Sequence, residues 1–123
     1  MIEYILIISD TGYVKKLDKM YFQSYNLRRK GKAVFNFDSP KNNGSPTAIL
    51  TGVTDKHEIY MLSKMGRVFR GLVKDITPKK TYSSVGIKAM ELDKDDEIIY
   101  VDKNLLTKEE LNKINLSRKS YGK

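Results

Sequence analysis

Basic side chains able to bind phosphate gather in one stretch of this sequence. Seven basic residues and a single acidic one, Asp18, lie between Tyr13 and Lys32. The seven are Lys15, Lys16, Lys19, Arg28, Arg29, Lys30 and Lys32. Consecutive cations beside a glycine let the backbone approach a phosphate group while lysine and arginine neutralise its charge. The run Arg28-Arg29-Lys30-Gly31 is therefore where we expect the main contact with a nucleic-acid backbone.

A second set of cations follows later in the chain, at Lys64, Arg67, Arg70, Lys74, Lys79, Lys80 and Lys88. From both sets, the residues that we expect to contact duplex DNA are Lys15, Lys16, Arg28, Arg29, Lys30, Gly31, Lys32, Arg67, Arg70, Lys79 and Lys80. Contacts to phosphates position a duplex without reading its bases, so we expect little sequence preference. The aromatic residues Tyr21, Phe22 and Tyr25 fit packing beneath a loop as well as contact with DNA.

The overall composition favours a polyanionic partner and excludes several kinds of chemistry. Lys and Arg total 23 against 15 Asp and Glu, which gives a formal charge of +8, and such an excess favours nucleic acid or another acidic surface. No cysteine is present, which excludes disulfides, thiolate nucleophiles and zinc sites built on cysteine. The one histidine, His57, precedes an apolar run and is expected to be a surface residue at a strand edge. We expect no metal site and no cofactor.

The chain contains one pattern twice, and this repeat predicts the elements that hold the cations. Residues 5–16 align with residues 59–70 at an offset of 54, with serine, glycine, valine and a terminal basic residue at matching places. Gly31-Lys32-Ala33 then matches Gly86-Ile87-Lys88, and residues 47–53 match residues 97–101. Because the matches keep their order, an internal duplication explains them better than chance similarity between two hairpins.

Each copy is expected to form four strands. In the first copy the strands are residues 3–8, 13–17, 34–37 and 48–53, with a hairpin turn at Asp10-Thr11-Gly12, where Asp10 can brace the turn with its side chain. In the second copy residues 59–70 form the same hairpin, and strands at 85–92 and 97–101 follow. Four strands in roughly fifty residues is the size of a propeller-type blade.

After the second copy the pattern changes from strand to helix. Thr107-Lys108-Glu109-Glu110 is a capping box, and Leu111, Ile114 and Leu116 form a short apolar stripe behind it. We expect a helix of two to three turns that ends in a basic tail at residues 118–123. This helix is either a solvated end of the chain or a cover for an exposed sheet edge.

Two stretches resemble the β-pinwheel at the C-terminus of the A subunit of DNA gyrase and topoisomerase IV. Residues 5–16 resemble the opening of a blade, and residues 59–70 resemble a later blade. Residues 27–33 resemble a degenerate form of the gyrase-A box, Gln-Arg-Arg-Gly-Gly-Arg-Gly. The likeness covers about the first hundred residues. It implies a mainly β fold with two four-stranded propeller-type (β-pinwheel) blades, at residues 1–54 and 55–102, and a short C-terminal helix with a basic tail at 103–123.

The departures from the box limit what the resemblance implies. Arg28, Arg29 and Gly31 match the box, Lys32 is a conservative replacement, and Leu27, Lys30 and Ala33 differ from it. The intact box is associated with chiral wrapping of DNA, and these departures argue against chiral wrapping by this chain. The resemblance still implies binding of duplex DNA, without chemistry on it. The chain also has two blades where that domain usually has five or six, and it lacks the cleavage region with its active-site tyrosine.

The partners implied by the resemblance are duplex DNA and other blade-bearing chains. Two blades leave strand edges exposed, and neighbouring blades in this family exchange strands, so the chain is expected to self-associate, to be capped by its own helix or to dock on a topoisomerase A subunit. An alternative function is therefore a protein-interaction module. RNA binding is a weaker alternative, because no stacking platform is visible.

A minor alternative of another class rests on Asp10. Asp10-Thr11-Gly12 after a hydrophobic strand is also the signature of aspartic proteases, in which paired carboxylates activate a water. Here Tyr13 follows where that family typically has Ser, Thr or Ala, and Lys64 fills the matching position of the second copy. We therefore expect Asp10 to shape a turn.

The N-terminal residues predict where the chain is found. Met1-Ile2-Glu3-Tyr4 has no basic region ahead of a hydrophobic segment, which does not fit a signal peptide. The longest apolar run, residues 4–8, is too short to span a bilayer and predicts no contact with a membrane. We expect a cytoplasmic protein.

Overall fold

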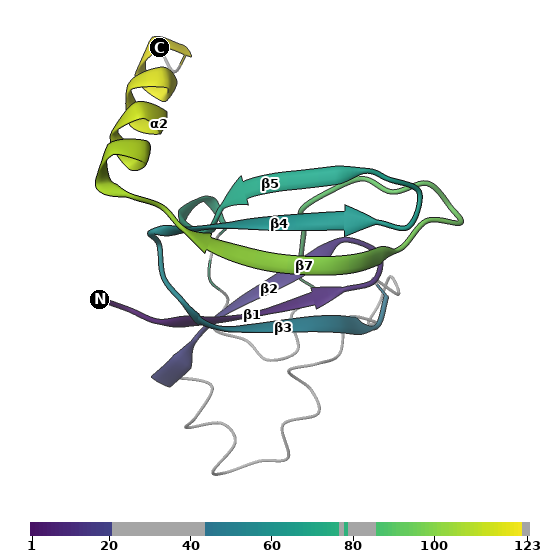
Figure 1. Ribbon diagram of the computed structural model, residues 1–123. Coiled ribbons are helices and arrows are strands. Elements are labelled where there is room, and N and C mark those ends of the chain that lie inside the picture. Colours follow the sequence, from purple (N-terminus) through teal and green to yellow (C-terminus); the bar gives the residue numbers. More distant parts are fainter. Residues whose placement is uncertain (21–43, 77, 79–85, 122–123) are drawn as a thin grey trace.

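The computed structural model describes residues 1–20, 44–76, 78 and 86–121, with side chains up to residue 114. The strand expected at residues 34–37 lies outside these ranges. Within them the chain is mainly β, as predicted, with two antiparallel sheets and one α-helix of more than one turn. Figure 1 shows the sheets stacked face to face, with the helix at one end of the second sheet.

The two sheets contain seven strands among the residues that the structure describes. Across the first sheet the order is β3 (Pro46–Val53), β1 (Tyr4–Ser9), β2 (Tyr13–Asp18) and β6 (Ile87–Lys88). Across the second it is β5 (Val68–Leu72), β4 (His57–Ser63) and β7 (Ile98–Leu105). A short 3-10 helix, η2 (Val73–Asp75), follows β5.

The predicted repeat is visible in matching hairpins. In each hairpin a buried serine accepts a bond at its hydroxyl from the backbone N–H four residues later, from Tyr13 to Ser9 and from Arg67 to Ser63, both at 3.0 Å. Gly12 and Gly66 close the two turns with φ near +90°, which glycine adopts without a steric cost. Serine and glycine therefore recur at the offset of 54 because they make the same turn.

The sequence suggested that Asp10 braces its own turn, but the structure shows a different contact. Its Oδ1 accepts a bond from Ser45 N at 3.0 Å, and its backbone N–H donates to Ser45 O at 2.8 Å. Asp10 thus joins the first hairpin to the start of β3. In the second copy the turn bond comes from Asp96, whose Oδ1 accepts from Met65 N at 2.9 Å. The two carboxylates therefore have different roles, because Asp10 joins its hairpin to β3 and Asp96 supports the turn of the second hairpin.

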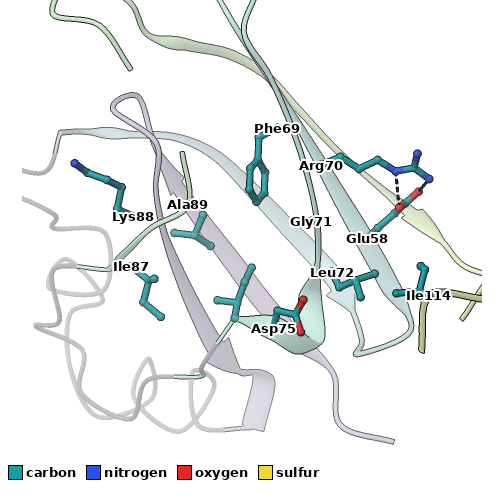
Figure 2. A pocket seen from close by; sticks show the side chains of 12 residues that line it. Glu58, Phe69, Arg70, Gly71, Leu72, Asp75, Ile87, Lys88, Ala89 and Ile114 are labelled. Carbon is teal, nitrogen blue, oxygen red and sulfur yellow. Dashed lines mark hydrogen bonds and ion pairs between the residues drawn. The ribbon is translucent and has the colours of Figure 1, made fainter. Parts of the chain in front are cut away.

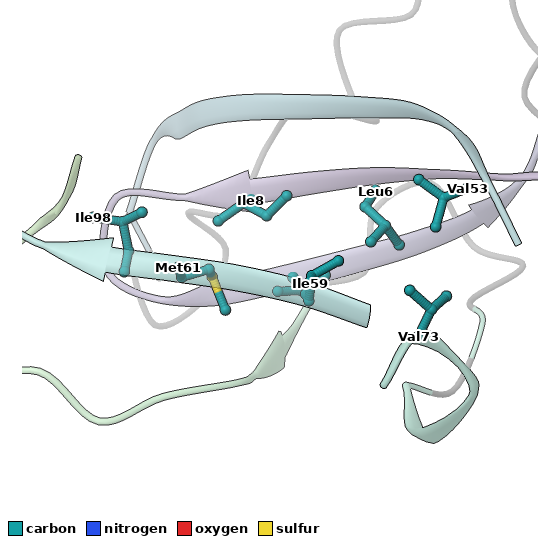
Figure 3. Packing of buried hydrophobic residues seen from close by; sticks show 8 residues of the cluster. Leu6, Ile8, Val53, Ile59, Met61, Val73 and Ile98 are labelled. Atoms are coloured by element: carbon teal, nitrogen blue, oxygen red, sulfur yellow. The ribbon is translucent and has the colours of Figure 1, made fainter. Parts of the chain in front are cut away.

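Aliphatic side chains between the two sheets form the core. Leu6, Ile8 and Val14 of the first sheet pack against Ile59 and Met61 of the second, and all five are fully buried. Figure 3 shows Leu6, Ile8, Ile59 and Met61 between the sheets, with Val53, Val73 and Ile98 around them. Burial of apolar surface between the sheets is the main force that joins the two copies.

The two copies present opposite faces to this core. Alternation along a strand puts Leu6 and Ile8 on the core face of β1. At the offset of 54 they correspond to Tyr60 and Leu62, which alternate with the core residues Ile59 and Met61 and so face away from the first sheet. The copies therefore stack in the same orientation, like successive blades of a propeller.

The two predicted copies are not separate sheets. Residues 85–92 were expected to form a strand of the second blade, but only Ile87–Lys88 is a strand, and it pairs with Tyr13 and Val14 of β2. The second sheet consequently has three strands in the described residues, where four were expected. Ala89 N also donates to Gly12 O at 2.9 Å, which extends the pairing of this segment of the second copy with the first hairpin.

The last strand and the helix both run further than expected. β7 continues to Leu105, beyond the end expected at residue 101. The capping box is confirmed, because Glu110 N donates to Thr107 Oγ1 at 3.1 Å and Thr107 N donates to Glu110 Oε1 at 3.0 Å. The helix, α2 (Lys108–Tyr121), has 14 residues and extends into the segment predicted to be a basic tail.

Candidate nucleic-acid interface

The excess of positive charge is not carried by the sheets. The segments outside the described residues, 21–43, 77, 79–85 and 122–123, contain eight of the 23 basic residues and one of the 15 acidic residues. They therefore carry +7 of the formal charge of +8. The described residues contain 15 basic and 14 acidic side chains and are close to neutral.

Three of the four described ends of the two longer basic segments lie next to the first sheet, and the fourth, Pro78, follows η2. The segment 21–43 leaves from Met20, just after β2, and re-enters at Gly44, next to Asp10 and Thr11 of the first hairpin. The segment 79–85 re-enters at Gly86, immediately before β6. Both segments are thus attached to β2 or its neighbours, although they are 35 or more residues apart in the sequence.

Most of the cations expected to contact DNA belong to these segments. Arg28, Arg29, Lys30, Gly31, Lys32, Lys79 and Lys80 all lie outside the described residues. Four of the predicted cations remain, Lys15, Lys16, Arg67 and Arg70, and the structure describes each of them.

Lys15 and Lys16 are not surface cations, which corrects the sequence prediction. Their exposed fractions are 0% and 2%. Lys16 points between the sheets, where Nζ donates to Asp55 Oδ1 at 2.8 Å and to Val73 O at 2.9 Å. It also lies over the ring of Tyr4, 4.2 Å from the centroid. Lys16 therefore joins the first sheet to the turn before β4 and to η2, and neither ammonium group is placed to reach a phosphate.

Burial changes the acidity of Lys15. Because the charged form is poorly solvated there, desolvation lowers the pKa of Lys15 to about 8. Lys15 lies opposite Ile7 on β1, on the face of the first sheet that points away from the core. Ile5, Ile7 and Leu17 share this face and are also buried. The outer face is thus removed from water along β1 and β2, whereas Ile49 of β3, which lies opposite Ile7, is 51% exposed.

Arg67 and Arg70 lie on the surface but are already engaged with carboxylates. Arg67 is half exposed and lies 3.5 Å from Asp93, which makes a weak pair. Arg70 makes two bonds to the buried carboxylate of Glu58, from Nε at 2.8 Å and from Nη2 at 3.0 Å. Arg70 also lies 5.5 Å from the centroid of the Tyr60 ring.

The Glu58 carboxylate explains why Arg70 is held in place. It is 3% exposed and accepts further bonds from the Tyr60 hydroxyl and from Asn104 Nδ2. The pKa of Glu58 is held below its usual value mainly by the hydrogen bonds from Arg70, which outweigh the effect of burial. Since an unpaired buried carboxylate is costly, Arg70 has a structural role that the sequence did not indicate.

A groove opens between β5 and β6, at the edges of the two sheets. Its volume is about 650 Å³, and its lining is mainly apolar. Figure 2 shows Phe69, Gly71 and Leu72 on one side and Ile87 and Ala89 on the other. No sequence signal identified this groove, because it requires β6 to cross into the first sheet.

His57 and Asp10, the two other residues considered for chemistry, make contacts that hold turns and strands in place. The ring Nδ1 of His57 lies 3.0 Å from the N–H of Thr54, closing the turn between β3 and β4, and burial lowers its pKa. Within the described residues no three His, Asp or Glu side chains are grouped as a metal site. The carboxylate of Asp10 holds the backbone of Ser45, as described above.

Comparisons with known proteins identify a similar fold. No protein-family model matches the chain, and no curated protein matches it. A solved structure described as "Structure of DNA gyrase A C-terminal domain" is similar, with a TM-score of 0.64 and 22% sequence identity. The match covers 83% of this chain and 33% of that chain, so this chain spans about a third of the solved domain. In the described residues, no helix has the length and apolar character needed to cross a membrane.

Proposed function

We propose that this chain binds duplex DNA without sequence preference, bending or wrapping it, and that it does no chemistry on the DNA. The contacts are made by the two basic segments, 21–43 and 79–85, with Arg28, Arg29 and Lys30 as the main group. The proposal places the chain in the cytoplasm. The β-pinwheel-like fold, similar to the gyrase A domain, supports this assignment.

The observation that carries the proposal is the distribution of charge. The described framework is nearly neutral, and its predicted cations are buried or paired with carboxylates. The two longer basic segments carry most of the excess, and each has at least one end next to the first sheet. Cations without nearby acidic residues in the sequence favour phosphate binding, because each phosphate that they neutralise releases counterions from the DNA.

The test is a titration of a fluorescent mixed-sequence duplex at several salt concentrations. The wild-type chain is compared with the variant Arg28→Ala/Arg29→Ala/Lys30→Ala. We expect the affinity to fall steeply with salt, and the variant to reduce the slope of log K against log salt by roughly two to three. A second duplex of different sequence should bind with the same affinity.

The matched control is Lys56→Ala/Lys94→Ala/Lys113→Ala, which removes the same charge from exposed lysines of the described framework. Its slope should change by less than one. If both variants lose the same slope, binding depends on net charge alone and the assignment to the Arg28 group is wrong. A wild-type chain that does not bind at low salt overturns DNA binding altogether.

A protein-interaction module, for example one that docks on a topoisomerase A subunit, is the second candidate function. It is favoured by one observation, the edge strand β5, which pairs with β4 alone among the described strands. This function is assigned to β5 and DNA binding to other residues of the chain, so one does not exclude the other.

A further inference from the structure

The internal repeat makes the edge of β5 equivalent to an edge that is occupied in the first copy. β5 corresponds to β2 at the offset of 54, and both follow the same serine- and glycine-containing turn. The far edge of β2 pairs with β6, where Val14 lies opposite Ile87. In the described part of the chain, no strand takes the corresponding place beside β5.

The backbone groups on this edge are those that bind a further strand. Ser63 N donates to Arg67 O at 2.9 Å, so Arg67 and every second residue after it direct their backbone groups toward β4. Val68, Arg70 and Leu72 therefore direct their N–H and C=O groups away from the sheet. Val14, the equivalent of Val68, directs its own groups toward β6.

The groove described above lies directly beside this edge. Phe69, on the core face of β5, lines it together with Ile87 and Ala89 (Figure 2). Gly71 keeps the space free for the Phe69 ring, since a Cβ atom there would lie 2.6 Å from Phe69 Cζ. A strand added to β5 would place alternate side chains against this apolar surface. On its other face it would lie beside Val68, which is 69% exposed.

We propose that the edge of β5 binds an extended segment of another protein, as an added strand of the second sheet. The segment carries an aliphatic residue opposite Val68, as Ile87 lies opposite Val14, and a carboxylate opposite Arg70. The two residues on its groove side are apolar. The inference does not require DNA binding, and it gives the second candidate function a specific surface.

The structure argues against a second copy of this chain as the occupant. Antiparallel pairing of two β5 strands through all three outward residues puts Arg70 opposite Arg70, and like charges at directly paired positions are destabilising. A donated β6 from a second copy competes with its own first sheet, where the effective concentration is on the order of millimolar. A different polypeptide with a carboxylate at this position meets neither obstacle.

The test is a titration of the 15N-labelled full chain with the capped peptide Thr-Val-Glu-Val-Ile-Thr, followed by amide chemical shifts. In the intended register its Glu lies opposite Arg70 and its Ile opposite Val68. We expect the largest shifts at the amides of Val68, Arg70 and Leu72. Replacing the peptide Glu by Lys should weaken binding about two- to fivefold, since a favourable cross-strand pair becomes a repulsive one.

Two changes remove backbone bonds and serve as controls. A peptide with Pro in place of Glu lacks one N–H, so its affinity should fall about fivefold or more, with no change to the protein. Val68→Pro removes an outward N–H at the first residue of an edge strand, where proline is tolerated, and should cause a similar loss. Val68→Thr keeps the N–H and should bind like the wild type.

Three results would overturn the proposal. The first is no shift at millimolar peptide, and the second is equal binding of the Glu, Lys and Pro peptides. The third is a concentration-dependent shift of the same amides without peptide, which would identify a second copy as the occupant. None of these results bears on the duplex titration, so the two proposals fail independently.

Discussion

At the scale of residues, burial rather than type decides what the lysines of β2 do. Lys15 and Lys16 are adjacent in the sequence, and alternation along the strand puts them on opposite faces. Both faces are buried, so Lys16 becomes an ion-paired link between the sheets and Lys15 becomes a cation deprived of water. Arg70 likewise is held by the buried carboxylate of Glu58. Three of the predicted DNA contacts are thus parts of the framework.

Lys15 predicts a specific dependence of stability on pH. Its pKa is lowered to about 8 by burial, whereas an exposed lysine titrates near 10.4. Between these values the unfolded chain binds more protons than the folded chain, so the free energy of unfolding rises with pH. We expect it to rise by about 1 kcal/mol between pH 7 and 9, relative to the variant Lys15→Met.

Urea unfolding of both proteins at each pH measures this difference. Lys15→Met removes the titrating group and keeps much of its volume, so its free energy of unfolding should lack this dependence on pH. Identical pH profiles for the two proteins would show that Lys15 is not desolvated in the folded chain.

At the scale of elements, side-chain bonds to the backbone fix the ends of strands and of the helix. Ser9 and Ser63 each accept an N–H inside a tight turn, Asp10 joins the first hairpin to the start of β3, and Asp96 accepts an N–H of the second turn. Thr107 and Glu110 satisfy backbone donors at the start of α2 in the same way. These short-range bonds use polar residues at fixed spacing, which is why the turns and the capping box could be predicted from the sequence.

The capping box predicts the effect of changing Thr107. Thr107→Ala leaves Glu110 N without its side-chain acceptor and should destabilise α2 by about 1 kcal/mol. Thr107→Ser keeps the hydroxyl and should behave like the wild type. Amide hydrogen exchange in the first turn of α2 measures the change, with the β4 amides as an internal reference. Unchanged exchange rates in Thr107→Ala would mean that the cap does not hold the helix.

At the scale of the whole molecule, the two copies share one core and one sheet. β6 belongs to the second copy in the sequence but pairs with β2 of the first, and the eight-residue core is shared between the sheets. Lys16 adds a further link from the first sheet to η2. Since the copies stack with the same orientation, the outer face of the second sheet carries Tyr60, Leu62 and Val68, the equivalents of the core residues of the first.

This shared core predicts that damage to one copy spreads to the other. Met61→Ala removes a fully buried side chain of the second sheet and should cost about 2–5 kcal/mol. We expect the opening free energies of the slowest β1 and β4 amides, measured by hydrogen exchange, to fall by the same amount. The exposed Val68→Ala should change neither. A loss confined to β4 would show that the copies unfold separately.

The sequence by itself determined the repeat, the hairpins, the helix cap and the mainly β fold. These features depend on glycine, serine and threonine at fixed positions and on strand periodicity, which act over a few residues. Only the tertiary structure decided the crossing of β6, the burial of Lys15 and Lys16 and the pairing of Arg70 with Glu58. These depend on which strand edges and faces meet, and local sequence patterns carry no such information. The crossing of β6, for example, pairs Tyr13 with Lys88, 75 residues later in the chain. The role of the Arg28 group remains a prediction for the duplex titration.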